Sequence, residues 1–209
     1  NQNPGLKEVS IFVNDGGDGV FNGNDYALFY ARGPHTWEYS KSLNDYNHTY
    51  NIYSDQSFYF ITVNNGAGKR IQPVGYAAGA ANYTTTTFDD FQFIETDLYN
   101  LVGSGKEWFG DLFDFKLSYD YTLNFANIDV TDTAFFQTRA VARSSVANTT
   151  MVYKVNGAEV ANLKFAAVGS GSGNDHVTQE DDTLPFLPTS GTMQINAKYK
   201  NNGNSSATA

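Results

Sequence analysis

The chain has 209 residues and a formal net charge of −9, and 41% of its residues are apolar, which suffices for one large domain or two small ones. The acidic balance, without any cluster of Lys or Arg, excludes nucleic acid as a partner. The absence of cysteine excludes disulfides, thiolate metal ligands and a cysteine nucleophile within these residues.

The N-terminal part of the chain predicts short strands separated by Gly- and Asn-rich turns. Residues 8–13 and 25–31 are the first two expected strands, and Arg32-Gly33-Pro34 ends the second because Pro cannot donate to a ladder. Residues 49–53 and 57–63 predict a hairpin, and alternating apolar side chains in the second strand lead us to expect that both of its faces are buried.

The middle of the chain predicts a linker followed by a helix. Residues 77–86 are small and polar, and a Gly-Lys-Arg turn with one more short strand precedes them. Apolar residues then recur at spacings of three and four, Thr87 and Asp90 resemble a weak capping box, and two glycines supply a stop. The stripe consists of Phe91, Ile94, Leu98 and Leu101.

The C-terminal part predicts a β-sandwich. Residues 117–125 alternate strictly between apolar and polar side chains, and a bulge or corner is expected at Ala126-Asn127. Further strands are expected at 134–143 and 193–199, and Asn156-Gly157 predicts a type I′ turn between two more. The expected fold is therefore mainly β, with an N-terminal β unit (1–80), a linker and short α-helical segment (81–112) and a β-sandwich unit (113–209).

Several motifs that suggest catalysis lack residues that the chemistry requires. "GAGK" (66–69) and "GSGK" (103–106) lack the earlier Gly and the following Ser or Thr of a phosphate-binding loop, and "GSGSG" (169–173) has no strand-to-helix elbow around it. The histidines, His35, His48 and His176, lack metal spacing, so we expect surface or turn residues. The acidic pairs suit a solvated face, and no catalytic residue is assigned.

One loop has the composition of a calcium site. Residues 14–25, "NDGGDGVFNGND", place Asn14, Asp18 and Asp25 at positions one, five and twelve of an EF-hand-type loop, with Gly19 at position six. Gly16 at the third position, Asp25 in place of a bidentate Glu, and the lack of flanking helices argue against such a loop. We favour a structural Asx/Gly turn and retain Asp15, Asp18 and Asp25 as candidate Ca²⁺ ligands, with no other cofactor expected.

Three blocks of the chain carry a family resemblance. The first contains Asp25, Tyr26, Phe29, Tyr30, Gly33, Pro34 and Trp37; the second contains Tyr53, Ser54, Asp55, Tyr59, Phe60, Thr62, Gly68, Lys69 and Arg70; the third covers residues 97–110. Together they resemble the N-terminal, non-catalytic region of the sortases of the type IX secretion system, gingipain-like cysteine peptidases of Bacteroidetes. The resemblance is clear over residues 10–110 and weaker beyond.

The resemblance implies a role rather than an active site. Members of the family remove the C-terminal sorting domain from exported cargo and attach the cargo to lipopolysaccharide at the cell surface, on the outer membrane. Their catalytic His and Cys belong to a later domain, so the resemblance implies an accessory or scaffold module. The implied partners are that downstream peptidase domain, secretion-system subunits and cargo sorting domains.

Two other functions stay open at this point. A carbohydrate-binding β-sandwich is an alternative, because exposed Tyr and Trp would stack on sugars, while an independent hydrolase has the least support. The polar run 200–209 also leads us to expect that the sandwich lacks its final strand. An open edge of that kind would pair with a second copy. The sequence shows no apolar run long enough for a transmembrane helix, and its first residues are typical of an internal segment.

Overall fold

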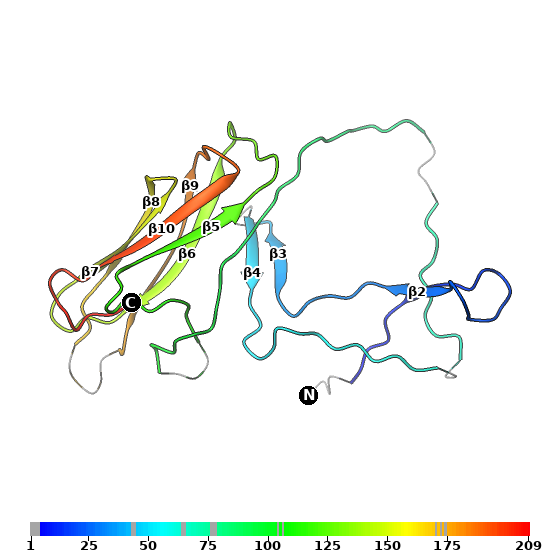
Figure 1. The fold of residues 1–209 in the computed structure, drawn as a ribbon, viewed down its shortest axis with the longest axis horizontal. Helices are drawn as coiled ribbons and strands as arrows, with labels where there is room; N and C mark the ends of the chain where they lie inside the picture. Colours follow the sequence, from blue (N-terminus) through cyan, green and yellow to red (C-terminus); the bar gives the residue numbers. More distant parts are fainter. Residues whose placement is uncertain are drawn as a thin grey trace. The chain divides into compact units, whose positions relative to one another are not determined.

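The computed structural model describes residues 5–42, 45–63, 66–75, 79–103, 105, 107–169, 171, 173 and 175–209. The chain divides into two compact units, Asn1–Thr84 (unit 1) and Thr85–Ala209 (unit 2). In the described residues all ten regular elements are strands (Figure 1), which confirms the mainly β fold. Within the described ranges there is no helix that would be long and apolar enough to cross a membrane. The predicted boundaries after residues 80 and 112 stay predictions.

Unit 1 contains two antiparallel hairpins. Strands β1 (Ile11–Asn14) and β2 (Tyr26–Phe29) pair with Ile11 opposite Phe29, which confirms the first two expected strands in shorter form. Strands β3 (Thr36–Ser40) and β4 (Asp45–Thr49) form the second hairpin. Cross-strand aromatic pairs stabilise it, since the rings of Trp37 and His48 lie 4.6 Å apart.

The expected hairpin of residues 49–53 and 57–63 was wrong, because β4 ends at Thr49 and residues 50–53 and 57–63 form no strand in this structure. Local hydrogen bonds occupy the backbone between them. The Asn51 side chain accepts from the N–H of Tyr53, and the Ser54 hydroxyl accepts from Gln56 and also donates to its carbonyl oxygen. Side chains of this type compete with a β ladder for the same backbone groups.

The expected helix after residue 87 was also wrong, because residues 85–100 contain no helix. The Thr85 hydroxyl and the Asp90 carboxylate bond the backbone beside them, and Phe109 exchanges backbone hydrogen bonds of 2.8 and 2.9 Å with Tyr99. Phe109 lies ten residues further along the chain than Tyr99. A stripe with helical spacing was therefore overridden by contacts that a local pattern does not contain.

Unit 2 is a sandwich of two antiparallel sheets. Its strands are β5 (Ser118–Asn124), β6 (Ala134–Ala142), β7 (Thr149–Val155), β8 (Ala158–Phe165), β9 (Thr178–Phe186) and β10 (Thr192–Lys200). One sheet has the order β5-β10-β7-β8, and β6 and β9 form the other. This arrangement confirms the β-sandwich predicted for the second half of the chain.

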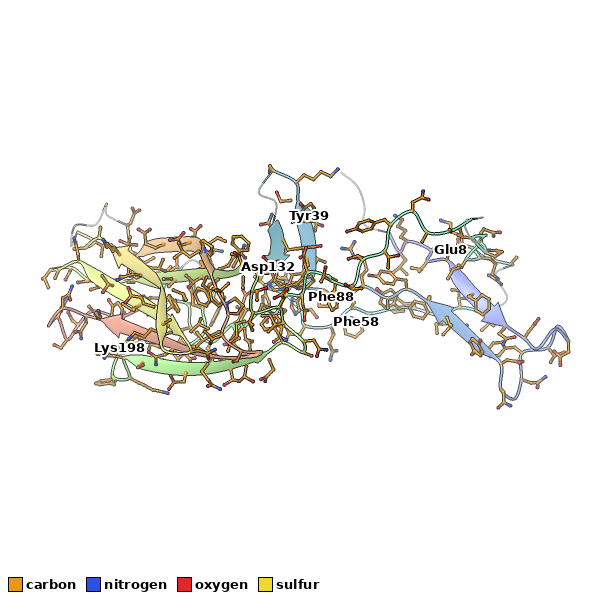
Figure 2. All side chains as sticks on the ribbon, turned by 90° about the horizontal axis from the view of Figure 1, so that it is seen from above. Glu8, Tyr39, Phe58, Phe88, Asp132 and Lys198 are labelled. Carbon is orange, nitrogen blue, oxygen red and sulfur yellow. The ribbon has the colours of Figure 1, made fainter. Side chains whose placement is uncertain are left out.

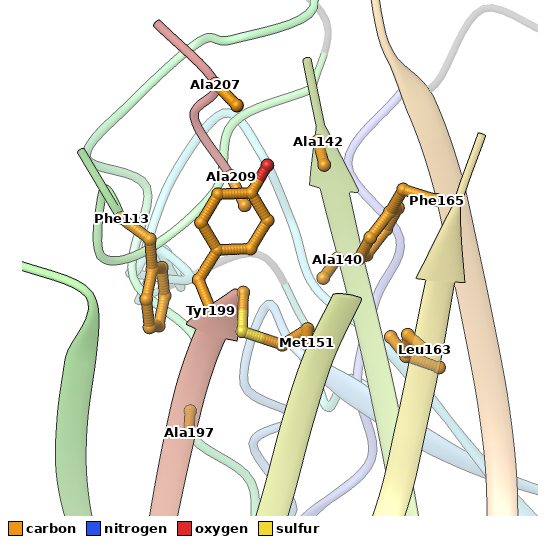
Figure 3. Packing of buried hydrophobic residues seen from close by; sticks show 10 residues of the cluster. All are labelled: Phe113, Ala140, Ala142, Met151, Leu163, Phe165, Ala197, Tyr199, Ala207 and Ala209. Carbon is orange, nitrogen blue, oxygen red and sulfur yellow. The ribbon is translucent and has the colours of Figure 1, made fainter. Parts of the chain in front are cut away.

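The sandwich core joins the two sheets. Ala140 and Ala142 of β6 face Met151, Leu163 and Phe165 of β7 and β8, and Figure 3 shows them around Tyr199. A second cluster surrounds Val155, Met193 and Ile195. The alternation predicted for 117–125 is confirmed, because Leu117, Tyr119, Tyr121, Leu123 and Phe125 all pack against one of these clusters.

Two turns of unit 2 agree with their sequence signals. Asn156 and Gly157 have φ angles of 49° and 86°, the positive values that a type I′ turn requires at both positions. Asn127 has a φ of 59° and lies in a turn directly after β5, which confirms the expected corner. Strands β6 and β10 confirm the expected strands at 134–143 and 193–199.

Candidate interaction surface

Unit 1 exposes its apolar side chains. Every buried residue among those described lies in unit 2, whereas Phe58 and Phe60 of unit 1 are 73% and 77% exposed (Phe58 is labelled in Figure 2). The expectation that both faces of residues 57–63 are buried was wrong. We call residues 58–63 the apolar segment; its exposed members also include Ile61 and Val63.

A single tyrosine anchors the apolar segment beside the end of β2. The Tyr59 hydroxyl accepts from the backbone N–H of Arg32 at 2.6 Å and donates to the carbonyl oxygen of Arg32 at 2.9 Å. Its ring lies 5.2 Å from that of Phe29. Because successive side chains of an extended chain point to opposite sides, a fixed Tyr59 directs Phe58 and Phe60 away from β2.

The Gly-Lys-Arg turn at residues 68–70 forms hydrogen bonds with Glu8 and with Ile11 of β1. The N–H of Lys69 donates to the Glu8 carboxylate at 2.7 Å, Ile11 donates to the carbonyl oxygen of Lys69, and Ile71 donates back to Ile11. Gly68 has a φ of 63°, and a β-carbon there would lie 3.0 Å from the Glu8 carboxylate. The short strand expected here is a parallel bridge, and the residues that look like a phosphate loop hold the backbone in place.

The hairpin of β3 and β4 brings together two histidines that the sequence pattern kept apart. The His35 and His48 rings lie 6.4 Å apart, and His35 stacks on Tyr50 at 4.3 Å. His35 Nδ1 accepts from the N–H of Asn51, and Nε2 lies 3.5 Å from the Asp55 carboxylate. Burial, with a smaller effect of His35, lowers the pKa of His48. The sequence did not predict this pair because it depends on the register of β3 and β4. That register places His48 opposite Trp37, two residues after His35.

The third histidine and the glycine-rich motifs add no catalytic geometry. Both ring nitrogens of His176 lie 2.6 Å from Arg143 Nη1, far along the chain from the other two histidines. Residues 104 and 106 of "GSGK", and 170 and 172 of "GSGSG", lie outside the described residues. Across the described residues, no three His, Asp or Glu side chains gather where they would hold a metal ion.

The candidate calcium ligands bind their own turn. Asp15 accepts from the N–H of Gly17, Asp18 from Val20, and Asp25 from Asn22 at 2.6 Å. The bonds of Asp15 and Asp18 are Asx-type, because each carboxylate accepts from the N–H two residues further on, as in a structural Asx/Gly turn. Each of the three carboxylates therefore accepts a backbone N–H of its own loop, and Ca²⁺ binding by Asp15, Asp18 and Asp25 stays a prediction.

No family model matches the chain, and no curated protein matches it. Among solved structures, the chain is similar to the crystal structure of dimeric latent PorU from Porphyromonas gingivalis, with a TM-score of 0.58 and 19% identity over 92% of this chain. The chain has a PorU-like fold. It spans only 18% of that PorU chain, and at this identity the similarity concerns the fold alone.

Proposed function

We propose that the chain is the N-terminal, non-catalytic module of a type IX secretion sortase at the outer-membrane surface of a bacterial cell. Two observations support the proposal. The sequence carries three blocks that resemble that region of the family, and the fold is similar to part of PorU. The two observations are of different kinds, because the blocks consist of residue identities and the similarity in fold concerns the path of the backbone.

The module acts as a scaffold that the peptidase domain of the same protein covers. The observation that carries this step is the contrast between the two units, because unit 2 contains every buried residue described and unit 1 exposes its apolar segment. Burying one large apolar side chain contributes about 1.5–3 kcal/mol. Covering Phe58, Phe60 and Ile61 with a partner would therefore favour docking. Secretion-system subunits and cargo sorting domains are further proposed partners.

The experiment measures binding of the purified chain to the separately purified peptidase domain of a full-length type IX sortase of this family. We expect the Phe58→Ser/Phe60→Ser double variant to bind at least about tenfold more weakly, because it removes two desolvated anchors. Phe115→Ser is the matched control, since Phe115 is 99% exposed in unit 2 and should not change binding. Equal binding by both variants would contradict the docking role.

Two further measurements separate this proposal from its alternatives. Peptidase activity in the 209-residue chain alone would overturn the non-catalytic role. Specific hits on a glycan array that disappear in Tyr53→Ala, a strongly exposed tyrosine of unit 1, would favour the carbohydrate-binding alternative. We expect neither result.

A further inference from the structure

The four-stranded sheet of unit 2 has one side in the core and the other in solvent. Alternate residues of β10, from Met193 to Tyr199, are buried, and the residues between them point to the opposite side of the sheet. Three adjacent strands place exposed lysines on this outer side, and Lys198 is labelled in Figure 2. We call the outer side the lysine face; its lysines are Lys154 of β7, Lys164 of β8, and Lys198 and Lys200 of β10.

The strand register gathers these lysines into neighbouring rows. Lys200 and Lys164 lie on either side of Thr150, and both are directly opposite it. Lys198 occupies the next row, and Lys154 lies in the row after that, opposite Asn196. From the usual spacings of a sheet, the four Cα atoms lie within a patch on the order of 10 Å by 13 Å.

Few carboxylates oppose this charge. On the outer side of the four strands the acidic residues are Asp120 and Glu159, and each accepts a hydrogen bond from an asparagine amide, at 2.7 and 3.2 Å. Among the described residues, none of the four lysines forms an ion pair. The whole chain has 13 Lys and Arg against 22 Asp and Glu, so the lysine face has the opposite sign of charge to the chain as a whole.

Val152 indicates how the lysine side chains lie. It belongs to the outer side of the sheet, yet it is only 4% exposed. Its cross-strand neighbours are Lys198 and Asn162, so their side chains cover it. A lysine whose stem lies on an apolar side chain keeps its ammonium group in water. The lysine face is therefore apolar next to the sheet and positively charged at its outer surface.

We propose that the lysine face binds the surface of a lipid bilayer that carries phosphate headgroups. Lysines that project the same way from three adjacent strands can reach a plane of phosphates together, and each acts as a compact point charge. One lysine near an anionic bilayer strengthens binding by about fivefold. The carboxylates elsewhere on the chain oppose this attraction little, because salt screens charges beyond about 10 Å. This proposal does not depend on the docking role of unit 1.

An acidic protein is a less suitable partner for this face. Protein interfaces are depleted in Lys and enriched in aromatic residues, Met and Arg. The outer side of β5, β7, β8 and β10 carries no aromatic residue, Met or Arg in the described strands. Clusters of lysines without such anchors are typical of proteins that bind anionic membranes.

The experiment sediments the 209-residue chain with vesicles of phosphatidylcholine, with or without about 30% phosphatidylglycerol, in about 50 mM NaCl. We expect binding to the anionic vesicles only, and a loss of binding in about 500 mM NaCl. Lys164→Gln/Lys200→Gln should bind at least about tenfold more weakly. Lys7→Gln/Lys41→Gln removes the same charge from exposed lysines of unit 1 and should bind like the parent chain. Circular dichroism checks that both variants are folded.

Each of four outcomes would overturn the proposal. Absence of binding to the anionic vesicles would remove its basis, and equal losses in the two lysine variants would show that net charge acts rather than this face. Binding that resists salt and disappears in Phe58→Ser/Phe60→Ser would place the membrane contact on the apolar segment. Stronger retention on beads coated with polyglutamate than on the vesicles, lost in Lys164→Gln/Lys200→Gln, would identify an acidic polypeptide as the partner.

Discussion

The Tyr121 hydroxyl, on β5, donates a 2.7 Å hydrogen bond to the Asp111 carboxylate. Burial and this bond both raise the pKa of Tyr121, and burial also raises the pKa of Tyr153 and Tyr199. A tyrosine in the unfolded chain ionises near pH 10. The folded state holds its protons to higher pH, so this contribution to stability is complete below about pH 10 and is lost as the pH rises further.

The first prediction concerns that pH dependence. We expect the free energy of unfolding to fall as the pH rises above about 10, because the unfolded chain loses protons that the folded chain retains. Tyr121→Phe should lower stability by about 1–2 kcal/mol at neutral pH and should flatten the alkaline decrease. Urea titrations at several pH values measure both effects. A parallel decrease in the variant would contradict the assignment.

The second prediction concerns Asn156, which ties the β7–β8 turn to β10. Its amide nitrogen donates to Thr189 and to the carbonyl oxygen of Thr192, and its amide oxygen accepts from the N–H of Gln194 at 2.8 Å. Asn156→Ala removes these bonds and also a residue that tolerates a positive φ. We expect a loss of about 1–3 kcal/mol by chemical denaturation. Asn162→Ala, on the exposed face of β8, is the control and should change stability by less than about 0.5 kcal/mol.

A third prediction rests on a close backbone contact at Gly191. A β-carbon there would lie 2.5 Å from the carbonyl oxygen of Phe125, and the Phe125 N–H bonds the carbonyl oxygen of Gly191. Because the obstructing atom belongs to the backbone, Gly191→Ala forces the two chains apart. We expect a loss of about 1–3 kcal/mol. Gly173→Ala has no atom within 4 Å of its new β-carbon, so thermal unfolding should not distinguish it from the parent chain.

The fourth prediction compares two phenylalanines. Phe165 is 1% exposed in the sandwich core, so Phe165→Ala should cost about 3–5 kcal/mol. Phe58→Ala should cost less than about 0.5 kcal/mol in the isolated chain, because Phe58 contributes to no core there. Denaturant titration followed by tyrosine fluorescence measures both. A large loss in Phe58→Ala would mean that the apolar segment stabilises the chain itself rather than a docked partner.

The fifth prediction concerns the loop of residues 14–25. Since Asp15, Asp18 and Asp25 accept hydrogen bonds from their own turn, we expect Ca²⁺ at about 1 mM to leave the NMR signals of Gly17 and Val20 unchanged. Saturable shifts that disappear in Asp18→Asn would establish the calcium site. Mg²⁺ at the same concentration controls for ionic strength.

The parts of the fold that the sequence predicted are those decided by local signals. Strict alternation over Leu117–Phe125 predicted a half-buried strand. Asn156-Gly157 predicted the type of the turn between β7 and β8. Both signals depend on neighbouring residues only. The helix failed because Leu98 and Tyr99 pair with Phe109, and the β3–β4 hairpin was missed because "TWEYS" and "DYNHT" lack a simple apolar alternation.

The candidate surface was predicted least well, and the reason is physical. The apolar segment has the pattern of a strand that is buried on both faces, with Phe58, Phe60 and Thr62 alternating with Tyr59, Ile61 and Val63. Such a pattern does not distinguish burial within the chain from burial by a partner. The histidine pair followed from register, which depends on where β3 and β4 turn.

The parallel bridge between Ile11 and Arg70 also determines the order in which the chain assembles. It closes a loop that contains residues 12–69, at an entropic cost on the order of 3–4 kcal/mol, and no described residue of unit 1 is buried to offset that cost. The β7–β8 hairpin, by contrast, closes over the short Asn156-Gly157 turn. We therefore expect unit 2 to fold before the bridge at Ile11 forms, and we expect limited proteolysis to cut near Gly68 before it cuts unit 2.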